Sequence, residues 1–244
     1  MTIAYGLYAW ALFVALGAAV VPILLLTPGL GRRRSLVRGL GRTVLRLVGM
    51  RVRVLGLERL QTPCVIVANH ASYLDGVLLQ AILPPRFSFV IKREMSSVPL
   101  AGTLLRRIGA EFVDRQDRMR GARDARRLLR NAARGEALVF FPEGTFSEQI
   151  GLLRFHIGAF TAAARAALPV VPIAIRGTRW CLPPGQALPH PGAIEVEVLA
   201  ALTEPNASAV RLRDAARAAL LAALGEPDLA PPESGADAVR DVGH

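Results

Sequence analysis

The sequence predicts an α/β fold with a mostly parallel central sheet and helices on both faces, preceded by an N-terminal membrane helix and a basic amphipathic helix. From about residue 51, short apolar, β-branched runs alternate with helical patterns, and 52% of all residues are apolar. The absence of charge before Arg32 predicts the membrane helix. A chain of 244 residues has room for one substantial domain with terminal additions.

The apolar segment 3–26 has 24 residues, and a helix of that length reaches across a hydrocarbon layer of about 30 Å. A signal peptide is the competing interpretation, but the segment lacks a basic start and is too long for one. A buried core helix is a second alternative, which the lack of a polar face disfavours. Pro22 leaves open a kinked helix that enters only half of the bilayer. We therefore expect membrane attachment and leave a full crossing open.

Residues 31–59 contain nine arginines and one glutamate. Arg38, Arg42 and Arg46 recur every four residues, which places them in one stripe of a helix beside apolar side chains. This pattern predicts a basic amphipathic helix at an anionic membrane surface, with the chain after residue 31 on the cytoplasmic side. A solvated face of a packed helix is the alternative. Residues 1–50 are thus the predicted membrane-anchoring region.

The α/β domain is predicted to span residues 51–225, with its motif-bearing core at 64–180. The expected strands are Val52–Leu55, Cys64–Ala68, Phe87–Ile91, Glu111–Val113, Ala137–Phe141, Val170–Ile175 and Ile194–Leu199. Helical patterns lie near 73–82, 99–108, 117–133 and 157–167, and a last amphipathic helix is expected at 207–224. Residues 226–244 are rich in Pro, Gly and Asp and are predicted to form a disordered tail.

The composition also excludes several classes of protein. Two cysteines cannot hold a disulfide-rich scaffold, and with four scattered histidines they give no zinc spacing. We therefore expect no metal and no bound cofactor. The net charge of +11 raises the alternative of a nucleic-acid-binding protein, but 6% aromatic residues and the uncharged N-terminus disfavour it.

Polar side chains follow several predicted strands, and the most informative are His70 and Asp75. An Asp five positions after a strand-ending His can hold the Nδ1–H of the imidazole, which leaves Nε2 free as a base. No Gly-x-Ser-x-Gly turn supplies a nucleophile from the protein, so the nucleophile would be a hydroxyl of the substrate. A helix-capping Asp beside a hydrogen-bonded His is an equally good interpretation of this pair alone.

Four blocks of sequence together resemble the glycerolipid acyltransferases of the lysophosphatidic acid acyltransferase (PlsC-like) family. Asn69-His70 with Asp75 looks like the NHxxxxD signature of that family. The other blocks are Gly109–Arg115, Phe141–Thr145 and Val171–Ile175 with Gly177-Thr178, which occur in the order of the family. The similarity covers roughly residues 52–180.

The resemblance implies transfer of a fatty acyl group from acyl-CoA or acyl-carrier protein to a hydroxyl of a lysophospholipid, with phosphatidic acid formed from lysophosphatidic acid as the leading case. It implies that His70 is the general base and that Asp75 orients it. Substrate contacts are implied for Asn69, Arg115, Glu143, Gly144 and Thr145: Arg115 on the phosphate, and Glu143 on the glycerol oxygens. Membrane lipids, the lysophospholipid and the acyl donor are the expected partners, and no nucleic acid is expected.

The sequence departs from the family at Phe146, where the third motif commonly has an arginine. This change removes positive charge from the expected place of the acceptor headgroup. A lyso-aminolipid, a glycolipid, another lysophospholipid or glycerol 3-phosphate therefore remain alternative acceptors for the same chemistry. A thioester hydrolase and a non-catalytic lipid-binding protein are further alternatives, although the intact His70–Asp75 pair disfavours the latter.

Overall fold

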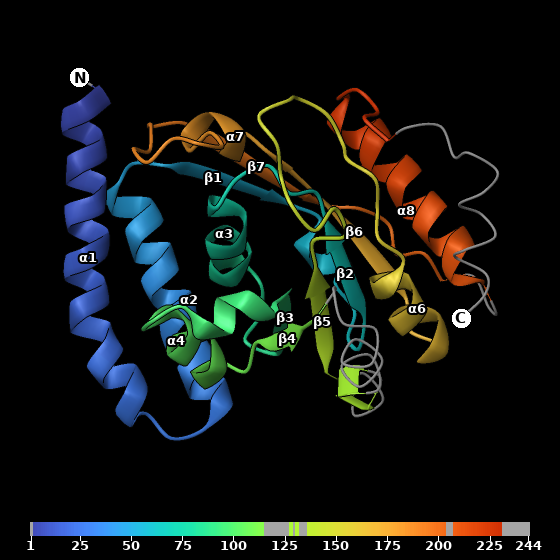
Figure 1. Cartoon of the computed structure of the whole chain (residues 1–244), viewed down its shortest axis with the longest axis horizontal. Coiled ribbons are helices and arrows are strands. Elements are labelled where there is room, and N and C mark those ends of the chain that lie inside the picture. The colour runs from blue at the N-terminus through green and yellow to red at the C-terminus, as the bar shows by residue number, and fades with distance from the viewer. Residues whose placement is uncertain (1, 115–126, 129, 132–135, 204–206, 231–244) are drawn as a thin grey trace.

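A computed structural model of the chain describes residues 2–114, 127–128, 130–131, 136–203 and 207–230. At its centre lies a seven-stranded sheet with the strand order β1-β7-β6-β2-β5-β3-β4 (Figure 1). The strands are β1 (Arg51–Leu55), β2 (Val65–Ala68), β3 (Phe87–Lys92), β4 (Glu111–Val113), β5 (Ala137–Phe140), β6 (Val170–Arg176) and β7 (Ala193–Val198). All seven strands that the sequence predicts are confirmed.

The sheet is mostly parallel, as predicted, with one reversal. Strands β6, β2, β5, β3 and β4 run in one direction, whereas β7 pairs antiparallel with β6, and β1 pairs parallel with β7. The starts of β1 and β7 therefore lie at the same edge of the sheet as the ends of β2, β5 and β6. Because loops that follow parallel strands carry the functional residues of such folds, this edge is where the site is expected.

Helices cover both faces of the sheet and close a hydrophobic core on each. Helices α2 (Leu30–Leu47) and α3 (Leu74–Ile82) pack on one face, and α6 (Gly158–Arg165) and α8 (Ala209–Leu224) pack on the other (Figure 1). Strand β2 shows why both faces are apolar: Ile66 and Ala68 belong to one core, whereas Val65 and Val67 belong to the other. A central strand buried on both sides needs a continuous apolar run, which the sequence supplies.

Shorter elements complete the domain. They are η1 (Leu57–Arg59), η2 (Arg93–Ser97), α4 (Ala101–Arg107) and α7 (Thr178–Cys181). Four of the helices predicted for the domain are confirmed within a few residues, as α3, α4, α6 and α8. Most of the fifth, predicted at 117–133, lies outside the described residues.

The N-terminal apolar segment forms α1 (Thr2–Leu26), which lies alongside α2 (Figure 1). It is a candidate membrane span by length and composition, and only 11% of its most apolar window is buried. Its hydroxyl and indole groups attach it to the domain: Tyr5 Oη donates to the Val48 carbonyl at 2.8 Å, and Trp10 Nε1 donates to the Ala187 carbonyl at 2.6 Å. Large apolar side chains elsewhere on the helix are exposed, among them Ile3, Leu7, Phe13, Val14, Ile23 and Leu26.

Helix α2 is amphipathic, and two of the three arginines of its stripe bond to the neighbouring helix; that the stripe faces a membrane stays a prediction. Arg38 donates to the Ile82 carbonyl at 3.0 Å, and Arg42 donates to the Ala81 carbonyl at 2.9 Å. These carbonyls lie at the end of α3, where backbone acceptors have no partner in their own helix and where a positive charge is favoured. Arg38 and Arg42 therefore join α2 to α3, a contact that periodicity alone could not show.

The predicted tail is also wrong at its start. Residues 226–230 pack against the segment around Leu152: Leu152 N–H donates to the Pro227 carbonyl at 2.9 Å, and Leu229 N–H donates to the Leu152 carbonyl at 3.0 Å. Residues 231–244 lie outside the described residues. The folded domain thus extends at least to residue 230.

Candidate active site

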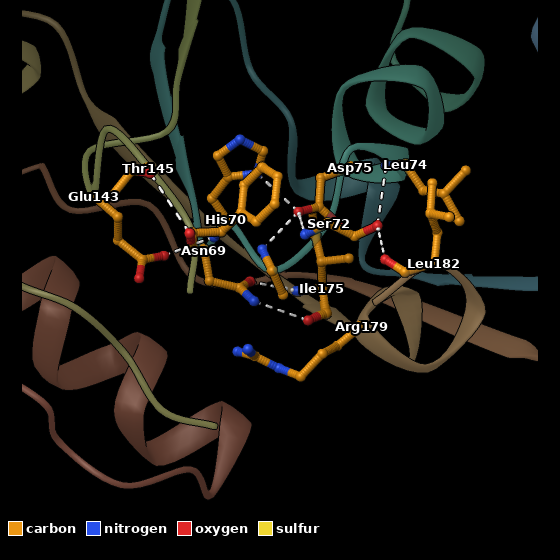
Figure 2. Close-up of polar contacts among 12 residues, drawn as sticks. Asn69, His70, Ser72, Leu74, Asp75, Glu143, Thr145, Ile175, Arg179 and Leu182 are labelled. Atoms are coloured by element: carbon orange, nitrogen blue, oxygen red, sulfur yellow. Dashed lines mark hydrogen bonds and ion pairs between the residues drawn. The ribbon is translucent and has the colours of Figure 1, made fainter. Parts of the chain in front are cut away.

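His70 and Asp75 lie at the edge of the sheet where β2 ends and α3 begins (Figure 2). His70 Nδ1 is 2.9 Å from Asp75 Oδ2. The same oxygen accepts the N–H groups of Ala71 at 2.7 Å and Ser72 at 2.8 Å. One buried oxygen of Asp75 therefore holds both the imidazole and the backbone of the loop between β2 and α3. The first N–H of α3, that of Leu74, is accepted by Ser72 Oγ at 3.2 Å, so the interpretation of Asp75 as a helix cap is wrong.

This arrangement orients the imidazole for base chemistry. Asp75 is fully buried, whereas the side chain of His70 is 20% exposed. An ionised carboxylate accepts hydrogen bonds only, so Nδ1 is the donor of this pair and Nε2 of a neutral ring keeps its lone pair. Figure 2 shows the other ring nitrogen pointing away from Asp75. The site thus presents one accessible base whose tautomer is fixed by a buried carboxylate.

Two phenylalanines from the loop after β5 surround the imidazole. The ring of Phe141 stacks on His70 with a centroid separation of 4.2 Å, and Phe146 meets its edge at 4.6 Å. Phe146 also contacts Tyr73, whose side chain is exposed at the surface beside the site. Sequence reasoning found Phe146 only as a missing arginine and did not predict either ring contact. The contacts depend on β2 and β5 being neighbours in the sheet.

Asn69 is directed into the protein and not towards a substrate. Its Nδ2 donates to the Ile175 carbonyl at 2.9 Å, and its Oδ1 accepts the Ile175 N–H at 2.7 Å. The amide group thereby continues the pairing of β2 with β6 beyond the last strand residue. It fixes the start of the loop that carries His70.

Glu143 is buried, and each of its carboxylate oxygens accepts a backbone N–H. Oε1 accepts from His70 at 2.6 Å, and Oε2 accepts from Leu153 at 2.8 Å (Figure 2 shows the His70 contact). Burial raises the pKa of Glu143 to about 7, although the two N–H groups oppose this rise by stabilising the charged form. The carboxylate ties the loop after β5 to the loop after β2. Glu143 therefore contacts the main chain of His70 and not its imidazole ring.

The remaining predicted residues lie nearby or cannot be placed. Gly144 has a φ of 72°, a left-handed conformation that favours glycine, and Thr145 after it is exposed. Arg115, predicted to hold a phosphate, lies outside the described residues. Arg179 on α7 donates to the carbonyls of Ser147 at 2.8 Å and Gln149 at 3.0 Å, which ties α7 to the loop after β5. Within the described part of the chain, no cluster of His, Cys, Asp and Glu could hold a metal ion.

A sequence model of the acyltransferases matches residues 51–176, which include the sheet edge and the His70–Asp75 pair. The chain belongs to the acyltransferase family. A 1-acyl-sn-glycerol-3-phosphate acyltransferase of Chlamydomonas reinhardtii is 35% identical over 75% of this chain and 54% of the relative. A lyso-ornithine lipid O-acyltransferase of Rhizobium meliloti is 36% identical over 63% of the chain and 52% of the relative. The chain thus spans about half the length of these curated relatives.

The chain also has the same fold as a solved structure. The crystal structure of the 1-acyl-sn-glycerophosphate acyltransferase PlsC from Thermotoga maritima superposes with a TM-score of 0.76. The match covers 92% of this chain and 95% of that chain at 22% identity. It confirms the predicted α/β architecture with its N-terminal apolar helix.

The raised pKa of Glu143 predicts how stability depends on pH. The folded protein keeps this proton up to a pH of about 7, whereas an unfolded glutamic acid loses it near 4.5. The free energy of unfolding should therefore fall as the pH rises through this window, by as much as about 3 kcal/mol. Glu143→Gln does not titrate, so its unfolding free energy, measured by denaturation between pH 4.5 and 8, should vary less. Parallel curves for the two proteins would contradict this account.

Proposed function

We propose that this protein transfers a fatty acyl group from acyl-CoA or acyl-carrier protein to the free hydroxyl of a lysophospholipid. The observation that carries the proposal is the partly exposed imidazole of His70, oriented by a buried carboxylate at 2.9 Å. Membership of the acyltransferase family supports the reaction class. Lysophosphatidic acid, converted to phosphatidic acid, is the first acceptor we propose, in keeping with the name of the algal relative.

In the proposed mechanism, Nε2 of His70 takes the proton of the acceptor hydroxyl as its oxygen attacks the thioester carbonyl. Asp75 stabilises the imidazolium that forms, because their hydrogen bond strengthens when the ring is charged. The tetrahedral adduct then collapses, the carbon–sulfur bond breaks, and the proton passes from His70 to the departing thiolate. A thiol with a pKa of about 8.5 is a good leaving group, so one base serves both steps.

A membrane location follows from the proposed substrate and is supported by α1. A lysophospholipid resides in a bilayer, and α1 exposes a row of large apolar side chains beside the domain. We propose that α1 inserts these side chains into the membrane, with the α/β domain on the cytoplasmic face. The exposed arginines that follow α1 suit the anionic headgroups of that face.

Replacing either member of the pair should lower turnover without unfolding the protein. His70→Ala removes the base, and Asp75→Asn removes the charge that orients it, so we expect kcat to fall by about 10²–10⁴ in each variant. The assay is thiol release from acyl-CoA in the presence of lysolipid. His190→Ala is the matched control and should keep its activity, because the ring of His190 contacts Gln186 and Trp180 and no residue assigned to the site.

Transfer retained in His70→Ala would overturn the mechanism. Thiol release that does not depend on lysolipid would instead identify a hydrolase. A thermal unfolding measurement on each variant separates loss of the base from loss of the fold.

We further propose that Glu143 positions His70 and does not bind the acceptor. Both of its oxygens are engaged by backbone N–H groups, so its removal should lower kcat and leave the KM for lysolipid almost unchanged. We expect Glu143→Gln, which can accept only one of the two hydrogen bonds, to lower kcat about tenfold or more. Steady-state kinetics with varied lysolipid check this, and Thr145→Ala on the exposed loop is the control. A raised KM with an unchanged kcat would restore Glu143 to the acceptor site.

Phe146 supports a second candidate for the acceptor, a lysolipid whose headgroup is not a phosphate monoester. Its ring meets His70 at 4.6 Å, so an aromatic surface lies where a guanidinium could otherwise bind phosphate. Phe146→Arg should raise the kcat/KM for lysophosphatidic acid relative to lysophosphatidylcholine by about tenfold, because one charge-assisted contact is worth roughly that factor. Phe146→Leu, which adds no charge, is the control. An unchanged ratio in Phe146→Arg would exclude this position from headgroup selection.

A further inference from the structure

A groove lined by arginines lies at the same edge of the sheet as His70 but on strands that the site does not use. It has a volume of about 730 Å³, and Arg51, Arg53 and Arg176 lie along it together with Glu195. Pockets of roughly 300–1,000 Å³ are the size that holds small organic ligands. The catalytic residues of the proposed mechanism do not line it.

The reversal of β7 and β1 places the groove at this edge. Arg51 begins β1 opposite Ala193, which begins β7, and Arg176 ends β6 opposite Glu195. Strand β2, which leads to His70, is separated from β1 by β6 and β7. Three strand spacings of about 4.8 Å put the two strands about 14 Å apart. Ile175, the residue before Arg176 in β6, forms two backbone hydrogen bonds with the side chain of Asn69, which is the neighbour of His70 in the chain.

The floor of the groove is a sheet face that no helix of the described residues covers. Val52 and Val54 pack into the core beneath α2, so their neighbours Arg51 and Arg53 point to the opposite face. Helix α8 packs on that face over β6, and the Ala223 carbonyl near its end accepts from Arg176. Beyond α8, none of the helices in the described part of the chain packs on the face of β7 and β1, and polar residues alternate along it in place of a second core.

The arginines of the groove differ in how far they are engaged. Arg176 is held by Glu195 at 2.9 Å and by Glu197 at 3.0 Å. Arg53 is 72% exposed and reaches Glu195 only at 3.4 Å. Arg51 is exposed and makes no side-chain hydrogen bond or ion pair within the described part of the chain. Three arginines against one glutamate leave the lining with an excess of positive charge. The guanidinium of Arg51 and the exposed guanidinium of Arg53, which has its one ion pair in the described residues at 3.4 Å, are placed to meet an anion.

We propose that this groove binds the phosphate groups of the acyl donor, acyl-CoA, a proposal that rests on the acyl transfer inferred above. Coenzyme A carries a diphosphate and a 3′-phosphate on its nucleotide, separated from the thioester by the pantetheine arm. A thioester at His70 therefore requires a nucleotide site displaced from the catalytic base. The pantetheine arm contains two amide groups and ends in the thiol, and when extended it is long enough to reach from β2 to β1. Guanidinium groups bind phosphate through paired, charge-assisted hydrogen bonds.

The test is a kinetic separation of the two substrates with the full chain. In the double variant Arg51→Gln/Arg53→Gln, the KM for acyl-CoA should rise about tenfold, whereas kcat and the KM for lysolipid stay within twofold of the wild type. Adenosine 3′,5′-bisphosphate should compete with acyl-CoA in the wild type and inhibit the double variant about tenfold less. Arg86→Gln is the matched control, because Arg86 is exposed at the opposite edge, before β3, and donates to the Thr62 hydroxyl at 2.8 Å.

Several outcomes would overturn the assignment while leaving acyl transfer intact. An unchanged KM for acyl-CoA in the double variant is one such outcome. Another is that the protein accepts acyl-carrier protein as the donor and does not accept acyl-CoA. Weaker binding to vesicles of anionic phospholipid, with the KM for acyl-CoA unchanged, would assign the arginines to lipid headgroups instead. If the wild type transfers no acyl group to any lysolipid, the proposed function fails; direct titration with adenosine 3′,5′-bisphosphate still tests the groove in that case.

Discussion

The site depends on one oxygen atom, Oδ2 of Asp75, which accepts three hydrogen bonds at the start of α3. Two come from the backbone N–H groups of Ala71 and Ser72 in the loop between β2 and α3, and the third comes from the imidazole of His70. The direction of the ring is therefore fixed by the same oxygen that holds the loop leading into the helix. Glu143 holds the backbone of His70 from the other side. The base is thus constrained at its ring and at its main chain by carboxylates from two different strand ends.

These two carboxylates differ in how far the sequence could predict them. The pair of His70 and Asp75 could be predicted, because the two lie five residues apart on a single strand–helix connection. The contact between Glu143 and His70 joins residues 73 positions apart and exists only because β5 lies beside β2. Periodicity and motif order specify which residues end a strand. They do not specify strand order, and so the sequence suggested a substrate contact where the structure has a backbone contact.

The two N-terminal helices show the same distinction between a pattern and its partner. The spacing of Arg38 and Arg42 indicated a shared helix face, yet that face meets the end of α3. Helix α1 is apolar on all sides, so nothing in its sequence marks the side that packs. In the structure, Tyr5 and Trp10 join its N-terminal half to two loops of the domain. A helix fastened in its N-terminal half in this way lies beside the domain and is not directed away from it (Figure 1).

The chemistry proposed for the site needs few polar groups from the protein. The acceptor brings its own nucleophile, and the thioester brings a leaving group that needs little activation. What the protein must supply is a base of fixed tautomer in a fixed place, and placement of that kind contributes much of the effect of a general base. Asn69, Asp75 and Glu143 accordingly bond to the main chain, where they hold the His70 loop to β6, α3 and β5. In this proposal selectivity depends on the side chains around the imidazole, and Phe141 and Phe146, which contact its ring, are aromatic.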